Sequence, residues 1–138
     1  MTYKTVFVDS DIILDMMLER DPFNKFSKML FQEAKTKSFA IYTSALVFAN
    51  LHYLIAKYFD RNIAKEQLRV LSKLITIISF DEEHVKLALS SEHVDFEDTV
   101  QYQIANKNNC DLIITRNTKH YKRFDIPVLT AEQFLRQL

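Results

Sequence analysis

The sequence predicts an α/β fold of three layers (α/β/α), in which helices cover both faces of a central, mostly parallel sheet of four or five strands. Short apolar runs typical of buried strands recur along the chain, and amphipathic segments of helical period separate them. The chain has 138 residues, of which 48% are hydrophobic, enough for a buried core. No repeat, linker or low-complexity segment interrupts it, so residues 1–138 are expected to form a single domain.

The first half of the chain contains two of the expected strands and three helices. Apolar runs predict strands at 4–8 and 39–43, and helices are expected over 11–18 and from Pro22 to about residue 37. Ser44 is a favourable N-cap for the third helix. Its apolar stripe has helical spacing and consists of Val47, Leu51, Leu54, Ile55 and Tyr58.

The second half continues the alternation of strands and helices. Strands are expected at 75–80, 111–115 and 126–130. A helix is expected over 63–74, and Asp81 and Asp95 each stand where a further helix begins. Thr130 and Gln133 have the spacing of a capping box for a last helix.

Charge and glycine content exclude several classes of binding site. The chain has 18 basic and 18 acidic residues, so a nucleic-acid partner would have to be held by a local patch or a metal ion. Glycine is absent altogether, which excludes the glycine-rich phosphate loop and the dinucleotide fingerprint. Left-handed turns must then fall to other residues, and Asn62, Asn108 and Asn109 are placed where such turns are wanted.

The single Cys110 excludes a disulfide framework within the chain and any cysteine-based zinc site. No apolar run approaches the ~18 residues that a membrane span needs, and the first residues do not resemble a signal peptide. We therefore expect a cytoplasmic protein with no membrane association.

Polar side chains follow two of the predicted strands at their carboxyl ends. Asp9 comes directly after TVFV, and Arg116 and Asn117 come after LIIT. In open α/β sheets ligands bind beyond these strand ends, so the residues meet if the two strands are neighbours. A carboxylate that ends a buried strand has little water, and it needs a cation or several hydrogen-bond donors to stay ionised.

A second acidic group lies in the segment DFED. Asp95 and Asp98 are three residues apart, and on a helix they share one face near the N-terminus. The structural alternative is that Asp95 only caps its helix, as Asp11 caps the short helix after Asp9. Asp15 is expected to line a solvated rim.

Oxygen ligands without a neighbouring cysteine suit a hard cation such as Mg²⁺ or Mn²⁺. Such an ion supports phosphodiester hydrolysis, because it activates water and neutralises the phosphate. The histidines show no metal-ligand spacing and are expected at the surface, although His120 lies near the proposed mouth.

Four segments, taken in order, resemble the PIN domain family across nearly the whole chain. They are VFVDSDIILD, TSALVFANL, DFEDTVQYQIA and DLIITRNTKHYKRFDIPVLTAEQFL. The resemblance implies a compact α/β/α fold. Its bacterial members include VapC-type toxins, which are Mg²⁺-dependent ribonucleases neutralised by an antitoxin protein.

The resemblance also implies site residues. The strand-end acid of the family falls on Asp9 with Ser10 as its companion hydroxyl, the helix acid falls on Asp98, and Asp95 matches an extra acid seen in part of the family.

At two positions the family's acids are replaced by Asn50 and Asn117. An amide can bind a metal through its oxygen but carries no charge, so metal affinity should fall. A branch of bacterial PIN-like proteins carries this T-R-N form, and we interpret Asn117 as part of a variant catalytic site. For Asn50 two readings stay open: a substrate contact, or a half-buried amide bonded to backbone.

Arg116 is the residue expected to contact an RNA phosphate, because it stands next to the proposed site. Apolar side chains of the second and third expected helices are candidates for a surface that binds an antitoxin or a second copy in a homodimer, although core packing explains them equally well. These are Phe23, Phe26, Met29, Leu30 and Tyr58.

Two other functions remain possible from the sequence. One is a catalytically weakened PIN module that binds RNA or a protein partner. The other is an aspartyl-nucleophile phosphatase of the haloacid-dehalogenase type, since the segment DSDII also resembles its motif, with Asp9 as nucleophile. The missing glycine counts against that enzyme class.

Overall fold

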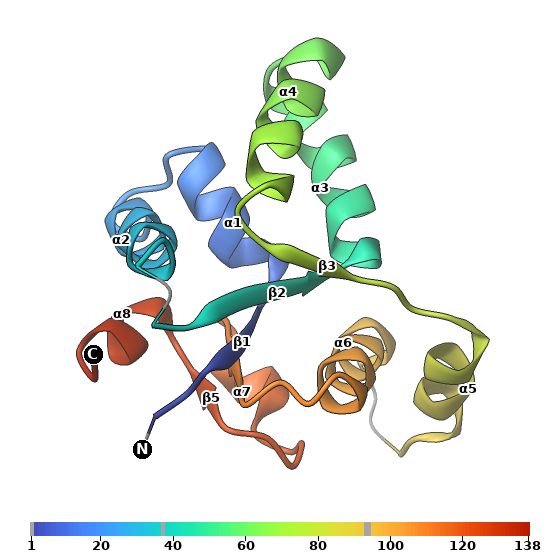
Figure 1. The fold of residues 1–138 in the computed structure, drawn as a ribbon. Coiled ribbons are helices and arrows are strands. Elements are labelled where there is room, and N and C mark those ends of the chain that lie inside the picture. Colours follow the sequence, from blue (N-terminus) through green and yellow to red (C-terminus); the bar gives the residue numbers. More distant parts are fainter. Residues whose placement is uncertain (1, 37, 93–94) are drawn as a thin grey trace.

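The centre of the molecule is a parallel sheet (Figure 1). The computed structural model describes residues 2–36, 38–92 and 95–138. Within these residues five strands pair in the order β3-β2-β1-β4-β5, and every neighbouring pair is parallel. The strands are β1 (Thr5–Val8), β2 (Ala40–Ser44), β3 (Thr76–Ile78), β4 (Leu112–Ile114) and β5 (Val128–Leu129). The predicted mostly parallel sheet is confirmed.

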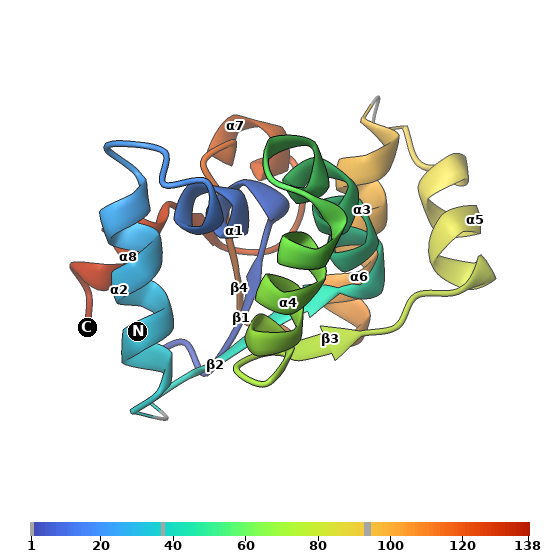
Figure 2. The same ribbon diagram turned by 90° about the horizontal axis from the view of Figure 1, so that it is seen from above.

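Helices cover both faces of the sheet, as Figures 1 and 2 show. One face carries α1 (Ser10–Met17), α2 (Asn24–Ala34), α3 (Ala45–Tyr58), α4 (Arg61–Ser72) and α8 (Ala131–Leu135). The other face carries α5 (Glu82–Ser90), α6 (Phe96–Lys107) and the short α7 (Thr118–Tyr121). This is the predicted three-layer α/β/α arrangement.

Side chains of the two central strands, β1 and β4, pack into both layers of the core. In β1, Val6 and Val8 pack with the α1–α4 layer, whereas Phe7 packs with the α6 layer, and all three are fully buried. Leu112 and Ile113 of β4 divide in the same way. A strand buried on both faces reads as a continuous apolar run, which is why period-two alternation is missing from these segments.

Capping side chains fix where several helices begin. The Ser44 hydroxyl accepts from the backbone N–H of Val47 (3.0 Å), and Thr130 forms the predicted capping box with Gln133. The Asp11 prediction was wrong, because the N-cap of α1 is Asp9, whose Oδ1 accepts from the Ser10 N–H at 2.8 Å. In that position Asp9 ends a strand and starts a helix at once.

Some element boundaries differ from the predicted ones. The helix expected from Pro22 begins at Asn24 and ends at Ala34, and residue 37 lies outside the described residues. The last strand is shorter than 126–130, because Pro127 has no N–H and joins the ladder only through its carbonyl, which accepts from Ile113 at 3.0 Å. Helix α7 was not predicted, since four residues are too few to show a period.

The residues that take the left-handed conformation in place of glycine are only in part the expected ones. Asn109 has φ of 56°, in the left-handed region. Asn62 and Asn108 do not, because Asn62 lies within α4 and Asn108 has φ of −100°. Glu19 takes a left-handed conformation instead, with φ of 50°. A single acidic residue after a helix does not indicate a left-handed conformation in the sequence.

Ser44 also links α3 to the helix that carries Asp98. Its hydroxyl donates to Oε1 of the buried Gln101 at 2.8 Å. We expect Ser44→Ala to lower the free energy of unfolding by about 2 kcal/mol, because it removes a helix cap and leaves a buried amide oxygen without this donor. Urea denaturation measures the change. The exposed Ser72→Ala is the control and should shift it by less than about 0.5 kcal/mol; an equal effect of both variants would contradict the assignment.

Candidate metal centre and active site

The pairing of β1 with β4 brings two strand ends together. Val8 is in register with Ile114, and the Asp9 N–H donates to the Ile114 carbonyl at 3.0 Å. Thr115 follows directly, so its side chain lies beside Asp9. The predicted meeting of these two strand ends is confirmed.

Asp9 is buried at this edge, with 9% of its surface exposed. Its Oδ1 accepts from the Ser10 N–H, and its Oδ2 accepts from the hydroxyls of Thr115 (3.0 Å) and Tyr121 (3.4 Å). Burial raises the pKa of Asp9, the charge of Asp98 raises it further, and the three hydrogen bonds partly offset the rise. The carboxylate is therefore only partly compensated by protein donors.

Tyr121 connects Asp9 to the acid on α6. Its hydroxyl lies 3.2 Å from Asp98 Oδ1 as well as near Asp9, and the residue is fully buried. Burial and the two carboxylates raise the pKa of Tyr121, so the phenol keeps its proton. The Tyr121 hydroxyl has one proton and can donate it to only one of the two carboxylates, Asp9 or Asp98, at a time. The other carboxylate then lacks this hydrogen bond.

Asp11 is a member of this group that the sequence reasoning treated as a cap. Its Oδ2 accepts from the Arg116 N–H (3.0 Å) and lies 3.3 Å from the Thr115 hydroxyl, whose single proton is shared with Asp9. Its Oδ1 is buried without a hydrogen-bond partner among the described residues. Burial, with the charge of Asp9, raises its pKa to about 6. The feature of the sequence that could have indicated this role is its position two residues after Asp9.

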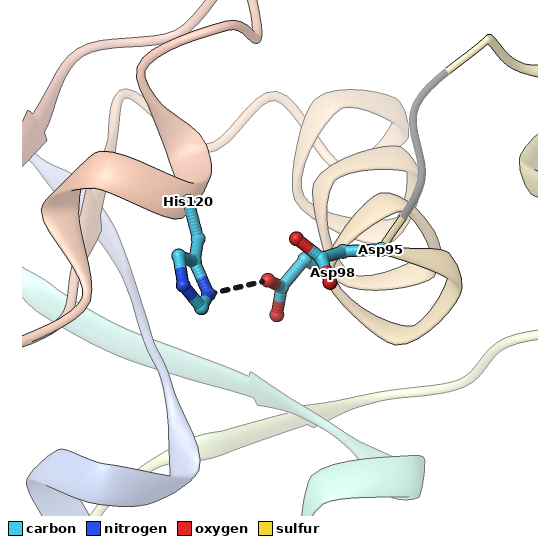
Figure 3. Close-up of side chains that lie close together, drawn as sticks. All are labelled: Asp95, Asp98 and His120. Carbon is cyan, nitrogen blue, oxygen red and sulfur yellow. Dashed lines mark hydrogen bonds and ion pairs between the residues drawn. The ribbon is translucent and has the colours of Figure 1, made fainter.

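Asp95, Asp98 and His120 form a second, more open part of the site (Figure 3). One ligand atom from each lies within 4.8 Å of the others, and His120 Nδ1 is 3.2 Å from Asp98 Oδ2. Asp95 stands at the N-cap position of α6 but makes no capping hydrogen bond with its side chain, which pairs with Arg123 at 2.8 Å. His120 is exposed as expected, yet it contacts the site.

Asp15 and the partly exposed Arg116 form an ion pair next to the acids. The prediction of a solvated rim for Asp15 was wrong, because the residue is fully buried. Its carboxylate accepts from Arg116 Nε (2.8 Å) and Nη2 (3.0 Å), and Arg20 Nε lies 3.0 Å away. The Arg116 guanidinium also lies over the Phe23 ring, 4.1 Å from its centroid. Two of the five Arg116 donors are thus already engaged.

The remaining predicted residues lie around this centre with fewer contacts. Ser10 is the first residue of α1 and binds Asp9 through its backbone. The Asn117 N–H donates to the Thr115 hydroxyl at 3.1 Å, while its side chain lines a neighbouring cavity. Asn50 is exposed on α3, so the half-buried reading of its amide was wrong. Among the described residues no hydrogen bond joins its side chain to the acids.

The donor set fits a hard divalent cation. Asp9, Asp11 and Asp98 lie around shared hydroxyl donors, and Asp95 adds a further carboxylate beside Asp98. Carboxylate oxygens are the ligands that Mg²⁺ and Mn²⁺ prefer. The unpartnered Asp11 Oδ1 and the mutual repulsion of the acids are the features that a bound cation would relieve.

Comparisons with known proteins identify relatives of this chain. The family profile described as PIN domain matches residues 5–119. Ribonuclease VapC1 of Aquifex aeolicus (strain VF5) is 31% identical over 139 residues, which cover 97% of this chain and 95% of that protein.

Solved structures share the fold at low identity. A toxin-antitoxin complex from Klebsiella pneumoniae matches with a TM-score of 0.66 and 19% identity, over 91% of this chain and 97% of that chain. VapC20 of Mycobacterium tuberculosis, a sarcin-ricin loop cleaving toxin, matches with a TM-score of 0.62 and 15% identity, over 78% of this chain and 86% of that chain. In the described part of the chain, no helix is long and apolar enough to cross a membrane.

We expect Asp11→Asn to raise the free energy of unfolding at pH 7, because a buried carboxylate next to Asp9 destabilises the fold. The pKa of Asp11 is about 6 when folded, against an ordinary value of 3.8. The folded state therefore binds more protons between these values, and wild-type stability falls as the pH rises through them. The advantage of the variant should be largest at pH 7 and vanish near pH 4.

Urea denaturation between pH 4 and 7 measures this difference. Asp125→Asn, at an exposed position, is the matched control and should leave stability unchanged across the range. An Asp11→Asn variant that is less stable than wild type at pH 7 would contradict the assignment.

Proposed function

Because the chain belongs to the PIN domain family, we propose that it is a Mg²⁺- or Mn²⁺-dependent ribonuclease that hydrolyses RNA phosphodiester bonds. The observation that carries the proposal is the convergence of Asp9, Asp11 and Asp98 on Thr115 and Tyr121 at the carboxyl edge of the sheet. The same edge is where α/β sheets bind ligands. The 31% identity to a ribonuclease, over nearly the whole chain, supports the same reaction.

Asp9, Asp95 and Asp98 are the proposed metal ligands, and Asp11 joins them through its unpartnered oxygen. Asp95 and Asp98 lie together in the cluster with His120, and Asp9 is linked to Asp98 through the Tyr121 hydroxyl. When bound, the cation would supply Lewis acidity that activates water and offsets the phosphate charge. The chain's own donors hold the carboxylates in place. The Ser10 N–H and the Thr115 hydroxyl orient Asp9.

The substrate contacts stay as proposals drawn from the predicted residues. Arg116 would meet an RNA phosphate with the N–H donors that Asp15 does not use, and its ion pair holds the guanidinium rigid. Ser10 and Asn50 are the remaining substrate-binding candidates. Asn50 and Asn117 stand where the family has acids, so we expect weaker metal affinity than a site with all four carboxylates would have.

We further propose that the protein is the toxin of a toxin–antitoxin pair and forms a homodimer. The likeness to a toxin-antitoxin complex supports the first part. Of the apolar residues predicted for a partner surface, Phe23, Met29 and Tyr58 are exposed, and Phe26 is partly buried. Leu30 is fully buried in the core and was wrongly included.

A second candidate is a PIN module with weakened catalysis that binds RNA or protein. The asparagines at positions 50 and 117 favour it, as does the contact that ties Asp98 to His120. Membership of the PIN family leaves the aspartyl-phosphatase interpretation without support.

Cleavage of single-stranded RNA separates these functions. We expect wild type to cleave with Mg²⁺ or Mn²⁺ and not with EDTA, and Asp9→Asn and Asp98→Asn each to lose about 100-fold or more, because each removes a ligand charge. Calorimetry should show weaker Mn²⁺ binding by both variants, and circular dichroism should show that they stay folded. Asp125→Asn is the control. Cleavage that persists in EDTA or in both variants would refute the proposal, and an inert wild type would favour the weakened module.

A further inference from the structure

We call the group of Asp9, Asp11 and Asp98 around Thr115 and Tyr121 the acidic centre. A cavity of about 270 Å³ opens near it, between α1, α2, the loop after β4 and the start of α8. We call it the base cavity and define it by the residues Asp15, Phe23, Phe26, Ser27, Arg116 and Asn117, which line it. We propose that the base cavity binds one nucleobase of the RNA, next to the bond that is cleaved. The inference rests on the proposed ribonuclease function and adds a subsite that selects the nucleotide.

The base cavity adjoins the acidic centre through α1 and through the residues that follow β4. The Thr115 hydroxyl contacts Asp9 and Asp11, and the next two residues of the chain, Arg116 and Asn117, line the cavity. Helix α1 supplies both Asp11 to the acidic centre and Asp15 to the cavity. A nucleobase is separated from its own phosphate by a single sugar. A phosphate held at the acids would therefore place a neighbouring base within reach of this cavity.

Size and stacking groups suit a flat ring. The volume lies just below the range of about 300–1,000 Å³ found for sites of drug-sized ligands, so the occupant is a ring system and not a whole dinucleotide. The Arg116 guanidinium is held in a plane by two hydrogen bonds to buried Asp15 and lies against Phe23. Phe26 adds a second ring. Proteins that recognise single-stranded RNA stack its bases on aromatic rings and arginine planes.

Two neutral polar residues of the base cavity, Ser27 and Asn117, have side chains free to bind a ligand, whereas its Thr130 caps α8 and its Glu132 pairs with Arg136. Ser27 is only 1% exposed, lines the cavity, and its hydroxyl has no hydrogen-bond partner among the residues that the structure describes. Asn117 also lines the cavity, and although it stands at the N-cap position of α7, its side chain makes no capping hydrogen bond. A hydroxyl and an amide both donate and accept, as the edges of nucleobases do. Asp15 does not repel such a ligand, because Arg116 and Arg20 already neutralise it.

Nucleotide binding tests the proposal without any cleavage. AMP, GMP, CMP and UMP contain no phosphodiester bond, and ribose 5-phosphate is the matched probe that lacks a base. In NMR titrations of ¹⁵N-labelled wild-type protein, we expect at least one nucleotide to bind about tenfold tighter than ribose 5-phosphate, the contribution of one stacked base. The base-dependent shifts should fall on the backbone amides of Ser27 and Asn117.

Two variants locate the contact. Ser27→Ala and Asn117→Ala should each reduce the preference for the nucleotide over ribose 5-phosphate about five- to tenfold, because each removes a hydrogen-bonding group. In Ser27→Ala, binding of ribose 5-phosphate itself should not change. Thermal unfolding of Ser27→Ala should match wild type, since its hydroxyl has no partner to lose. Asn62→Ala, at an exposed position on α4, is the control and should behave as wild type.

Equal affinity for all five probes, or shifts confined to other residues, would overturn the proposal. So would variants that keep the wild-type preference. If Ser27→Ala and Asn117→Ala weakened a protein complex while nucleotides failed to discriminate, the cavity would be a protein contact and the proposal would fall. The ribonuclease function is tested by a different experiment, and it fails if wild type shows no metal-dependent RNA cleavage. Base binding can still be measured in that case.

Discussion

The parallel pairing of β1 with β4 is the constraint on which the acidic centre depends. The hydrogen bond from the Asp9 N–H to the Ile114 carbonyl sets the register, and it puts Thr115 beside both Asp9 and Asp11. Side chains alternate between the faces of a sheet, so a slip of one residue would turn these groups to opposite sides. The apolar residues of both strands are buried on both faces and oppose such a slip.

The buried acids differ in whether their partners are charged or neutral. Asp15 is neutralised by Arg116 and Arg20, so its burial serves the packing between α1 and the loop after β4. Asp9 and Asp11 receive only neutral donors, and one oxygen of Asp11 receives none among the described residues. Groups with raised pKa values that crowd together at a strand end are a feature of functional sites.

The Arg116 segment joins the two halves of the site. Its backbone N–H binds Asp11 in the acidic centre, while its guanidinium binds Asp15 at the wall of the base cavity. A movement of this segment would therefore change both places at once. Arg116, the residue expected to contact an RNA phosphate, is found in an ion pair with Asp15 that uses two of its five side-chain donors.

The sequence by itself determined the layered fold, most helix starts and two of the central acids. These signals are local: an apolar run, a helical period, or a cap such as Ser44 or Thr130 involves residues within about four positions of each other. The tertiary structure alone decided the roles of Asp11, Asp15 and Tyr121. Their partners lie across the sheet, some hundred residues away along the chain. Only packing brings such groups into contact, and a buried acid and an exposed acid look alike until it does.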